Sequence, residues 1–180
     1  MDFLKKLETI NVDSTVEKDS IFNQINQAIQ NSDYSIEDFA PEKPWGAYWR
    51  FKNQQSEKFI NEFFPDLNFQ DVVNNNEIEL SPKILLTAPN QRLSWQYHFR
   101  RSEYWRSITG PAEFVRSTTD QENDPEKFPA GSMIKFKESE RHRLISKDGW
   151  SIVAEIWKHL DNGILSNEDD IVRLQDDYQR

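Results

Sequence analysis

A succession of short apolar segments limits the fold of this chain more than any other feature. From residue 77 to residue 157 these segments are rich in β-branched and aromatic residues, and turn signals such as APN, ITGP, PAG and SKDG separate them. Several short strands at this spacing are typical of an all-β sandwich or barrel. The predicted strands are EIEL, PKILLTA, RLSWQYHF, EYWRSIT, AEFVRST, SMIKFK, HRLIS and WSIVAEIW.

Three other segments have the spacing of amphipathic helices. Residues 17–30 place five apolar side chains three and four positions apart, and residues 56–64 form a second apolar face that Pro65 ends. Residues 165–180 return to helical spacing, and the letters SNED near their start resemble a capping box. Between the first two segments, APEKPWG at 40–46 is expected to be a turn.

The composition excludes several classes of function. Because the chain has no cysteine, a bound metal would need histidine, carboxylate or amide ligands. A net charge of -9 argues against nucleic acid and anionic membranes as partners, since both require a basic face. No segment approaches the roughly 20 apolar residues that span a bilayer. We therefore expect a cytoplasmic protein of one main domain that binds neither nucleic acid nor membrane.

Polar residues on one predicted hairpin form a candidate metal site. Gln96 and His98 are two positions apart, so their side chains share a face of an extended strand. Glu103 opens the next strand after a tight return through FRRS, and His142 lies on a later strand. These groups suit zinc, iron(II) or a similar divalent ion, although structural roles remain an alternative. His159 has no partner pattern and is predicted to be a surface or capping residue.

The spacing of these residues resembles the two sequence motifs of the cupin family. In this chain asparagine stands for the opening glycine of the first motif, and glutamine stands for its first histidine. The resemblance implies a double-stranded β-helix, or jelly-roll barrel, and the spacing of the apolar residues adds N-terminal helices and a short C-terminal helix to it. The first motif is matched by Asn90, Gln96, His98, Glu103 and Gly110, and the second by Gly131, Lys137, Ser139 and His142.

A longer part of the chain is similar to the cupin domain of type II mannose-6-phosphate isomerases. The shared features are a P-W-G turn, a lysine before the family's P-G turn, which reads P-N here, a hairpin that reads close to LSLQ-x-H and R-x-E-x-W, and the letters EDDIVR. The resemblance implies an N-terminal helical extension over residues 1–42 and a cupin domain over residues 43–180. It also implies that the metal ligands, for zinc first and for iron, manganese or cobalt as alternatives, are Gln96, His98, Glu103 and His142.

The activity that this resemblance implies is metal-dependent aldose–ketose isomerisation of a sugar phosphate. Mannose 6-phosphate and fructose 6-phosphate are the expected pair, and a related heptose or hexose phosphate is the next choice. Arg101 and Lys83 are the implied catalytic residues, and Lys83, Arg101 and Arg173 are the implied substrate-binding cations. Without the resemblance, Arg101 would be read as a solvated turn residue. The general base is left unassigned.

Two other functions remain open at this point. A noncatalytic cupin that binds a metal and a sugar is favoured by departures from the family pattern at Phe99, Arg100 and Tyr104. The N-terminal forty residues are also too few for the nucleotidyltransferase domain that many family members carry. An iron-dependent dioxygenase is disfavoured, because such sites usually present histidine where Gln96 stands. The N-terminal helices could cap an open barrel end or form the contact of a homodimer.

Overall fold

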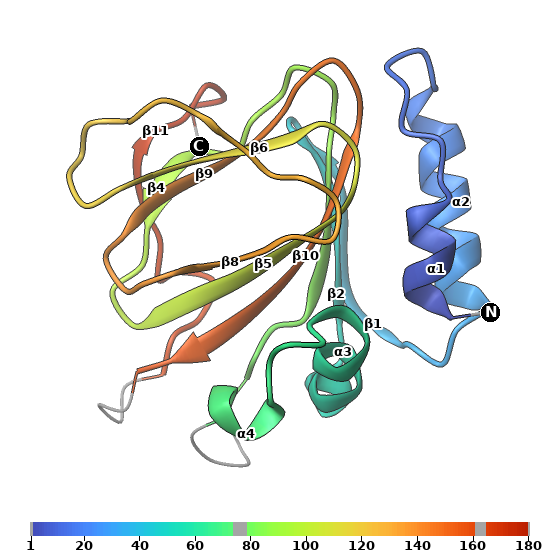
Figure 1. The fold of residues 1–180 in the computed structure, drawn as a ribbon, viewed down its shortest axis with the longest axis horizontal. Coiled ribbons are helices and arrows are strands. Elements are labelled where there is room, and N and C mark those ends of the chain that lie inside the picture. Colours follow the sequence, from blue (N-terminus) through green and yellow to red (C-terminus); the bar gives the residue numbers. More distant parts are fainter. Residues whose placement is uncertain (1, 74–78, 161–164, 180) are drawn as a thin grey trace.

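Two antiparallel sheets form the body of the protein in a computed structural model that describes residues 2–73, 79–160 and 165–179 (Figure 1). The first sheet contains, in spatial order, β1 (Ile36–Lys43), β2 (Gly46–Phe51), β3 (Lys83–Thr87), β10 (Ser151–His159), β5 (Arg101–Thr109) and β8 (Met133–Phe136). The second contains β11 (Val172–Gln175), β4 (Trp95–Tyr97), β9 (Arg141–Ser146), β6 (Ala112–Ser117) and β7 (Glu126–Lys127). The predicted all-β fold of the jelly-roll type is confirmed.

Strand β10 shows how the first sheet separates two hydrophobic clusters. Ile152, Ala154 and Ile156 point to the outer face, where they join a cluster that includes the N-terminal helices. Val153 points to the inner face and joins the cluster between the two sheets. Because alternate residues of a strand face opposite sides, Glu155 shares that inner face. Strand β10 therefore directs the polar side chain of Glu155 into the barrel interior from a mostly apolar sequence.

The helices lie outside the first sheet (Figure 1). The predicted segments 17–30 and 56–64 are confirmed as α2 (Lys18–Gln30) and α3 (Ser56–Phe63), and both bury their apolar faces. The sequence did not predict α1, η1 and α4, which are short. They span Phe3–Glu8, Asn53–Gln55 and Phe69–Val72. Among the described residues, no helix is both long and apolar enough to cross a membrane.

The predicted C-terminal helix is wrong, because β11 (Val172–Gln175) pairs with β4 there. Leu174 packs in a small cluster around Trp95, whereas Tyr178 packs in the cluster between the sheets. The two residues therefore do not share one helical face, although their spacing suggested it. The letters SNED do not cap a helix either, since Ser166 Oγ donates to the Asp170 carboxylate at 2.7 Å.

The segment APEKPWG is only partly a turn. Its first residues belong to β1, which ends at Lys43, and the turn proper precedes Gly46. The irregular register of β1 between Ala40 and Lys43 accommodates a proline, which cannot donate a ladder hydrogen bond. The domain boundary between residues 42 and 43 stays a prediction. Part of the predicted strand EIEL lies outside the described residues.

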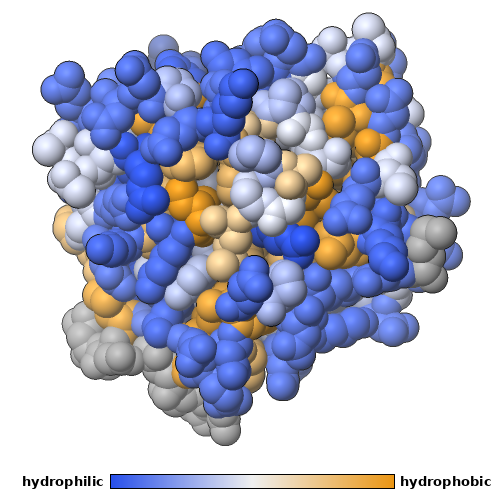
Figure 2. Space-filling model, in the orientation of Figure 1, coloured by the Kyte–Doolittle hydropathy of each residue, from blue (hydrophilic) through white to orange (hydrophobic). Residues whose placement is uncertain are grey.

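Polar side chains cover most of the face shown in Figure 2, with smaller hydrophobic areas between them. Large apolar side chains with substantial exposure are few among the described residues, and they are scattered along the sequence. Isolated exposed apolar residues are normal for a folded protein and need no special explanation. The exposed apolar side chains in this structure are Ile36, Phe99, Met133 and Leu165.

Candidate metal centre and its pocket

Three of the predicted metal ligands meet between the two sheets. Glu103 comes from β5, His142 comes from β9, and His98 directly follows β4. One ligand atom of each lies within 4.8 Å of the others, and all three side chains are buried. His98 Nε2 is 3.1 Å from Glu103 Oε1, and His142 Nε2 is 3.3 Å from Glu103 Oε2. We call these three residues the triad.

Two buried atoms of the triad have no hydrogen-bond partner among the described residues, namely Glu103 Oε2 and His142 Nε2. His98 Nδ1 contacts the main-chain carbonyl of Asp170, and His142 Nδ1 contacts that of Glu140 at 2.9 Å. Because a carbonyl only accepts, each Nδ1 carries the proton and each Nε2 directs a lone pair toward Glu103. Facing acceptor atoms in a buried site are costly without a cation between them. The triad therefore fits a divalent metal, and the carbonyl contacts are those that orient metal-binding histidines.

Electrostatics favour the metal-binding forms of Glu103 and His98. Burial alone would raise the pKa of Glu103, but the positive charge of Arg101 and the contacts with the two histidines outweigh it. The pKa of Glu103 is therefore well below its usual range. Burial lowers the pKa of His98. A charged carboxylate and a neutral imidazole are the forms that coordinate metals.

Gln96 lies beside the triad. It is the residue of β4 that pairs with His142 of β9, so their side chains start about 5 Å apart on one face. Its Oε1 accepts a hydrogen bond from Ser94 Oγ at 2.6 Å. An amide oxygen has two lone pairs, so this bond leaves one acceptor position for a cation. Gln96 as a fourth ligand stays a prediction.

Asp170 fastens the loop that carries His98. Its carboxylate accepts the main-chain N–H groups of Phe99 at 3.1 Å and Arg100 at 3.0 Å, and its carbonyl contacts the His98 ring. Ser166 Oγ donates to the same carboxylate. Asp170 belongs to the EDDIVR letters noted in the sequence and precedes β11, the neighbour of β4, but nothing in the sequence indicated that it supports the ligand that follows β4. It is a residue that sequence reasoning missed.

Asp170→Asn should weaken zinc or cobalt binding about 10- to 100-fold, the range typical of groups that orient a ligand. The amide nitrogen of asparagine cannot accept, so either Phe99 N–H loses its acceptor or both Arg100 N–H and Ser166 Oγ do, and His98 is less firmly oriented. Calorimetric titration of the metal-stripped protein measures the change. Asp177→Asn is the matched control, because Asp177 pairs with Arg92 at 2.7 Å instead. Equal metal affinities for the two variants would contradict the orienting role.

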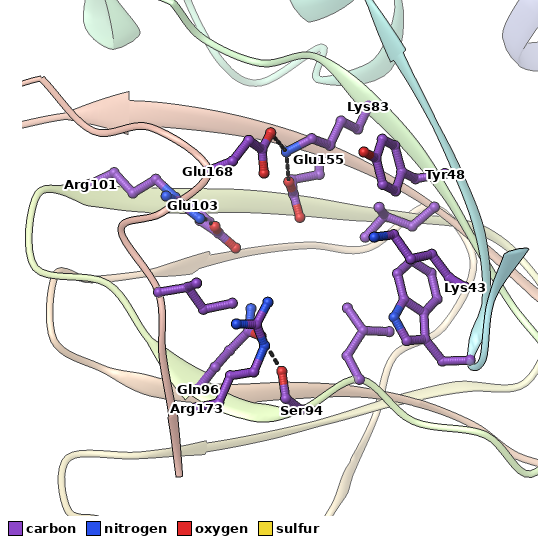
Figure 3. Close-up of a pocket in the computed structure, with 14 residues that line it drawn as sticks. Lys43, Tyr48, Lys83, Ser94, Gln96, Arg101, Glu103, Glu155, Glu168 and Arg173 are labelled. Atoms are coloured by element: carbon purple, nitrogen blue, oxygen red, sulfur yellow. Dashed lines mark hydrogen bonds and ion pairs between the residues drawn. The ribbon is translucent and has the colours of Figure 1, made fainter. Parts of the chain in front are cut away.

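A pocket opens onto Glu103 and Gln96 (Figure 3). The three predicted cations all line it, and the sequence did not identify Lys43, Glu155 and Glu168 as pocket residues. Lys43 was missed because it lies in a segment expected to be a turn. Glu155 was missed because it is one polar letter in an apolar strand. Among the described residues, the charged groups that line the pocket are Lys43, Lys83, Arg101, Arg173, Glu103, Glu155 and Glu168.

Two of the predicted cations are already engaged by carboxylates. Lys83 Nζ is 3.2 Å from Glu155 Oε1 and 3.0 Å from Glu168 Oε1. Arg101 Nε is 2.9 Å from Glu103 Oε1, and Arg101 is buried at the start of β5, so it is not a solvated turn residue. Both cations also lie over the ring of Trp157, at 4.1 Å for Lys83 and 3.8 Å for Arg101. They are part of the pocket wall.

The other two cations occupy different positions. Arg173 is on β11 opposite Gln96 of β4, and Figure 3 shows it beside Gln96 and Ser94. Lys43 ends β1 and lies 5.5 Å from the ring of Tyr48. Both side chains line the same cavity as Lys83 and Arg101. The pocket therefore has two cationic side chains besides Lys83 and Arg101.

The prediction for His159 is wrong. It is the last residue of β10 and is buried, with Nε2 contacting the carbonyl of Glu79 and Nδ1 accepting the N–H of Ser166 at 2.9 Å. Because β10 continues two residues past Trp157 on the same inner face, the ring is carried into the protein rather than to its surface. His159 joins the end of the sheet to the segment that contains Asp170.

Comparisons with known proteins support the fold and supply a family. CapF, a capsular polysaccharide assembling protein from Staphylococcus aureus, matches with a TM-score of 0.51 and 7% identity over 87% of this chain and 36% of CapF. The DMSP lyase DddQ from Ruegeria pomeroyi DSS-3 matches with a TM-score of 0.48 and 10% identity over 93% and 77% of the two chains. The CapF match shows the fold alone, and this chain spans little more than a third of CapF.

A cupin 2 conserved barrel domain protein from Salinispora arenicola CNS-205 has 20% identity and a TM-score of 0.39 over 48% of this chain and 68% of that protein. No curated protein gives a significant match. The family model described as "Mannose-6-phosphate isomerase C-terminal" matches residues 52–176, a range that contains the whole triad, Lys83 and Arg173. With more than half of its length matched, the chain belongs to the mannose-6-phosphate isomerase C-terminal family.

Proposed function

We propose that the protein is a metal-dependent isomerase of sugar phosphates. Mannose 6-phosphate and fructose 6-phosphate are the first pair to consider, and a related hexose or heptose phosphate is the next. The observation that carries the proposal is the buried triad, with two unpartnered polar atoms, at the base of a pocket that also contains four cationic side chains. Membership of the family supports a phosphorylated sugar as the substrate.

The triad would hold the metal, with Gln96 as a fourth ligand. Zinc is the proposed ion, and iron, manganese and cobalt suit the same nitrogen and oxygen donors. When bound, such an ion polarises a carbonyl group and can contribute several kcal/mol of transition-state stabilisation. Arg101 donates to Glu103 Oε1 and keeps that carboxylate charged and oriented. This is the role we propose for Arg101 in catalysis.

The phosphate group needs at least one cation among the residues that line the pocket. Lys83 bridges two glutamates, and Arg101 donates to Glu103 and Ser166. Arg173 lines the pocket opposite Gln96 and is our first choice for the phosphate, and Lys43, at the end of β1, is the second. A guanidinium can donate to two phosphate oxygens at once. Lys83 would instead contact hydroxyl groups of the sugar.

The test is a panel of sugar phosphates with metal-stripped and metal-restored protein. We expect mannose 6-phosphate to be converted into fructose 6-phosphate after zinc, cobalt or manganese is restored, and not before. Unphosphorylated mannose is the matched control, and its conversion should be far slower because the phosphate contacts are lost. Absence of aldose–ketose conversion with every metal and every phosphorylated sugar in the panel would refute the proposal.

A noncatalytic cupin that binds a metal and a sugar is the second candidate. The observation that favours it is the engagement of Lys83 and Arg101 by carboxylates, which leaves fewer groups for a reacting substrate. Saturable binding of the sugar phosphate without turnover would support this candidate. Turnover that His98→Ala abolishes would exclude it.

A further inference from the structure

We infer that Glu155 is the catalytic base that carries the proton between the two reacting carbons of the substrate. The inference rests on the proposed function and supplies the group that the sequence left unassigned. Glu155 lies on the inner face of β10 and lines the pocket, and its side chain is 8% exposed. It is therefore shielded from bulk water but open to a molecule that enters the pocket.

The other carboxylates and the phenol of the pocket are less suited to this role. Glu103 belongs to the triad, so its oxygens face the histidines. Glu168 has a side chain that is 55% exposed and is bonded to Lys83. Tyr48 donates its hydroxyl proton to the Asp38 carboxylate at 2.6 Å, so that hydroxyl is already engaged. Glu155 is the remaining carboxylate among the described lining residues.

Three donors orient Glu155 and leave one acceptor position on it. Lys83 Nζ and Trp157 Nε1 both donate to Oε1 at 3.2 Å, and Trp105 Nε1 donates to Oε2 at 3.2 Å. A carboxylate has about four lone-pair positions on its two oxygens. The second position of Oε2 therefore remains to take up a proton. The three donors hold the carboxylate in one orientation without saturating it.

Strand register places Glu155 beside the triad. On the antiparallel pair β10–β5, Glu155 is opposite Trp105 and Glu103 is opposite Trp157. The two glutamates are thus diagonal neighbours on one face, a relation that separates residues by about 7–8 Å. Figure 3 shows both carboxylates directed into the same pocket. A sugar bound in this pocket would therefore lie against both Glu103 of the triad and Glu155.

The environment of Glu155 also suits a base that must take and return a proton. Burial, and then the negative charge of Glu103, raise the pKa of Glu155. Proton transfer is most effective when the pKa of the group lies near the working pH, so an upward change from the usual range of a carboxyl group improves this base. The nearby ammonium of Lys83 limits the change.

The proposed step moves one proton from carbon to carbon. Glu155 Oε2 takes the proton on C2 of the aldose, the electrons of that C–H bond form a C1=C2 double bond, and the carbonyl electrons move to O1. A proton passes from O2 to O1, and Glu155 returns its proton to C1 while the C2–O2 double bond forms. The product is the ketose, and Glu155 ends as the carboxylate it was at the start.

The test compares native protein, Glu155→Gln and Glu113→Gln after zinc loading. Glutamine keeps the shape of Glu155 but cannot take the proton, so kcat with mannose 6-phosphate should fall at least about 100-fold. KM and bound zinc should change little. Exchange of the C2 proton with deuterated water, followed by nuclear magnetic resonance, should be lost. Glu113 is on β6 and pairs with Lys147 at 3.7 Å, so Glu113→Gln should behave as native protein.

The outcomes distinguish a failure of this inference from a failure of the proposed function. Native protein that isomerises no sugar phosphate refutes the proposed function. Active native protein together with Glu155→Gln that retains kcat and proton exchange within tenfold refutes only the assignment of Glu155. If Glu155→Gln fails to fold, Glu155→Ala with added formate replaces it. Restoration of proton exchange by formate then supports the inference, and unimpaired exchange without formate refutes it.

Discussion

His142→Ala should bind zinc or cobalt at least about 100-fold more weakly than native protein, because a direct ligand contributes more than the groups that orient it. His142 Nε2 is one of the two unpartnered buried atoms of the triad, and its ring stacks on Phe136 at 4.6 Å. Metal analysis after dialysis and calorimetric titration would measure the loss. Native protein at a metal concentration of about 100 times Kd gains about 2.7 kcal/mol of stability, and the variant should lose that gain.

His159→Gln is the matched control for this loss. His159 is also a buried histidine, but it bonds to Glu79 and Ser166 at the end of β10. Its replacement should lower stability without changing the number of metal ions bound per chain. A His142→Ala protein that keeps native metal affinity, or a His159→Gln protein that loses it, would show that the triad is not the metal centre.

Gly110→Ala should destabilise the protein by about 3 kcal/mol or more, a large loss for the addition of a single methyl group. Gly110 has a φ of +99°, and a Cβ atom there would lie 2.0 Å from the carbonyl oxygen of Trp150 and 2.8 Å from the Cα of Ser151. Both contacts are with backbone, which cannot move aside as a flexible side chain can. Urea unfolding monitored by tryptophan fluorescence would measure the change.

Gly131→Ala distinguishes the cost of a positive φ from the cost of a steric clash. Gly131 also has a positive φ, +84°, but a Cβ atom there would meet nothing within 4 Å. Only the conformational cost of about 1–2 kcal/mol then applies. Equal losses for Gly110→Ala and Gly131→Ala would mean that the contact with Trp150 contributes nothing.

Much of the barrel could be predicted because its strands alternate in a local pattern. Gln96, His98 and Glu103 were assigned to one site, but the predicted hairpin is wrong, because β4 and β5 belong to different sheets and His98 and Glu103 meet between those sheets. His142 required more, since its approach depends on the pairing of β4 with β9. The sequence of neither strand predicts that pairing. His142 was assigned to the site from the resemblance to the cupin motifs.

The errors arose where distant contacts decide the structure. The C-terminal segment has helical spacing, but its backbone finds hydrogen-bond partners on β4, and tertiary pairing overrides a weak local preference. Glu155 is a single polar letter within WSIVAEIW, and only the inner face of β10 reveals its neighbours. Asp170 accepts hydrogen bonds from the main-chain N–H groups of Phe99 and Arg100. Every residue except proline has such a group, so the residue types at these positions do not indicate the contact.

The helices on the outer face of the first sheet limit how two copies of this chain could assemble. That face is apolar on β2, β3 and β10, and it is buried under α1, α2 and α3 of the same chain. Two copies therefore cannot pair by stacking these sheet faces while the helices are in place. The predicted homodimer, if it forms, would use a surface other than this sheet face, and its two pockets would open independently of the helical layer.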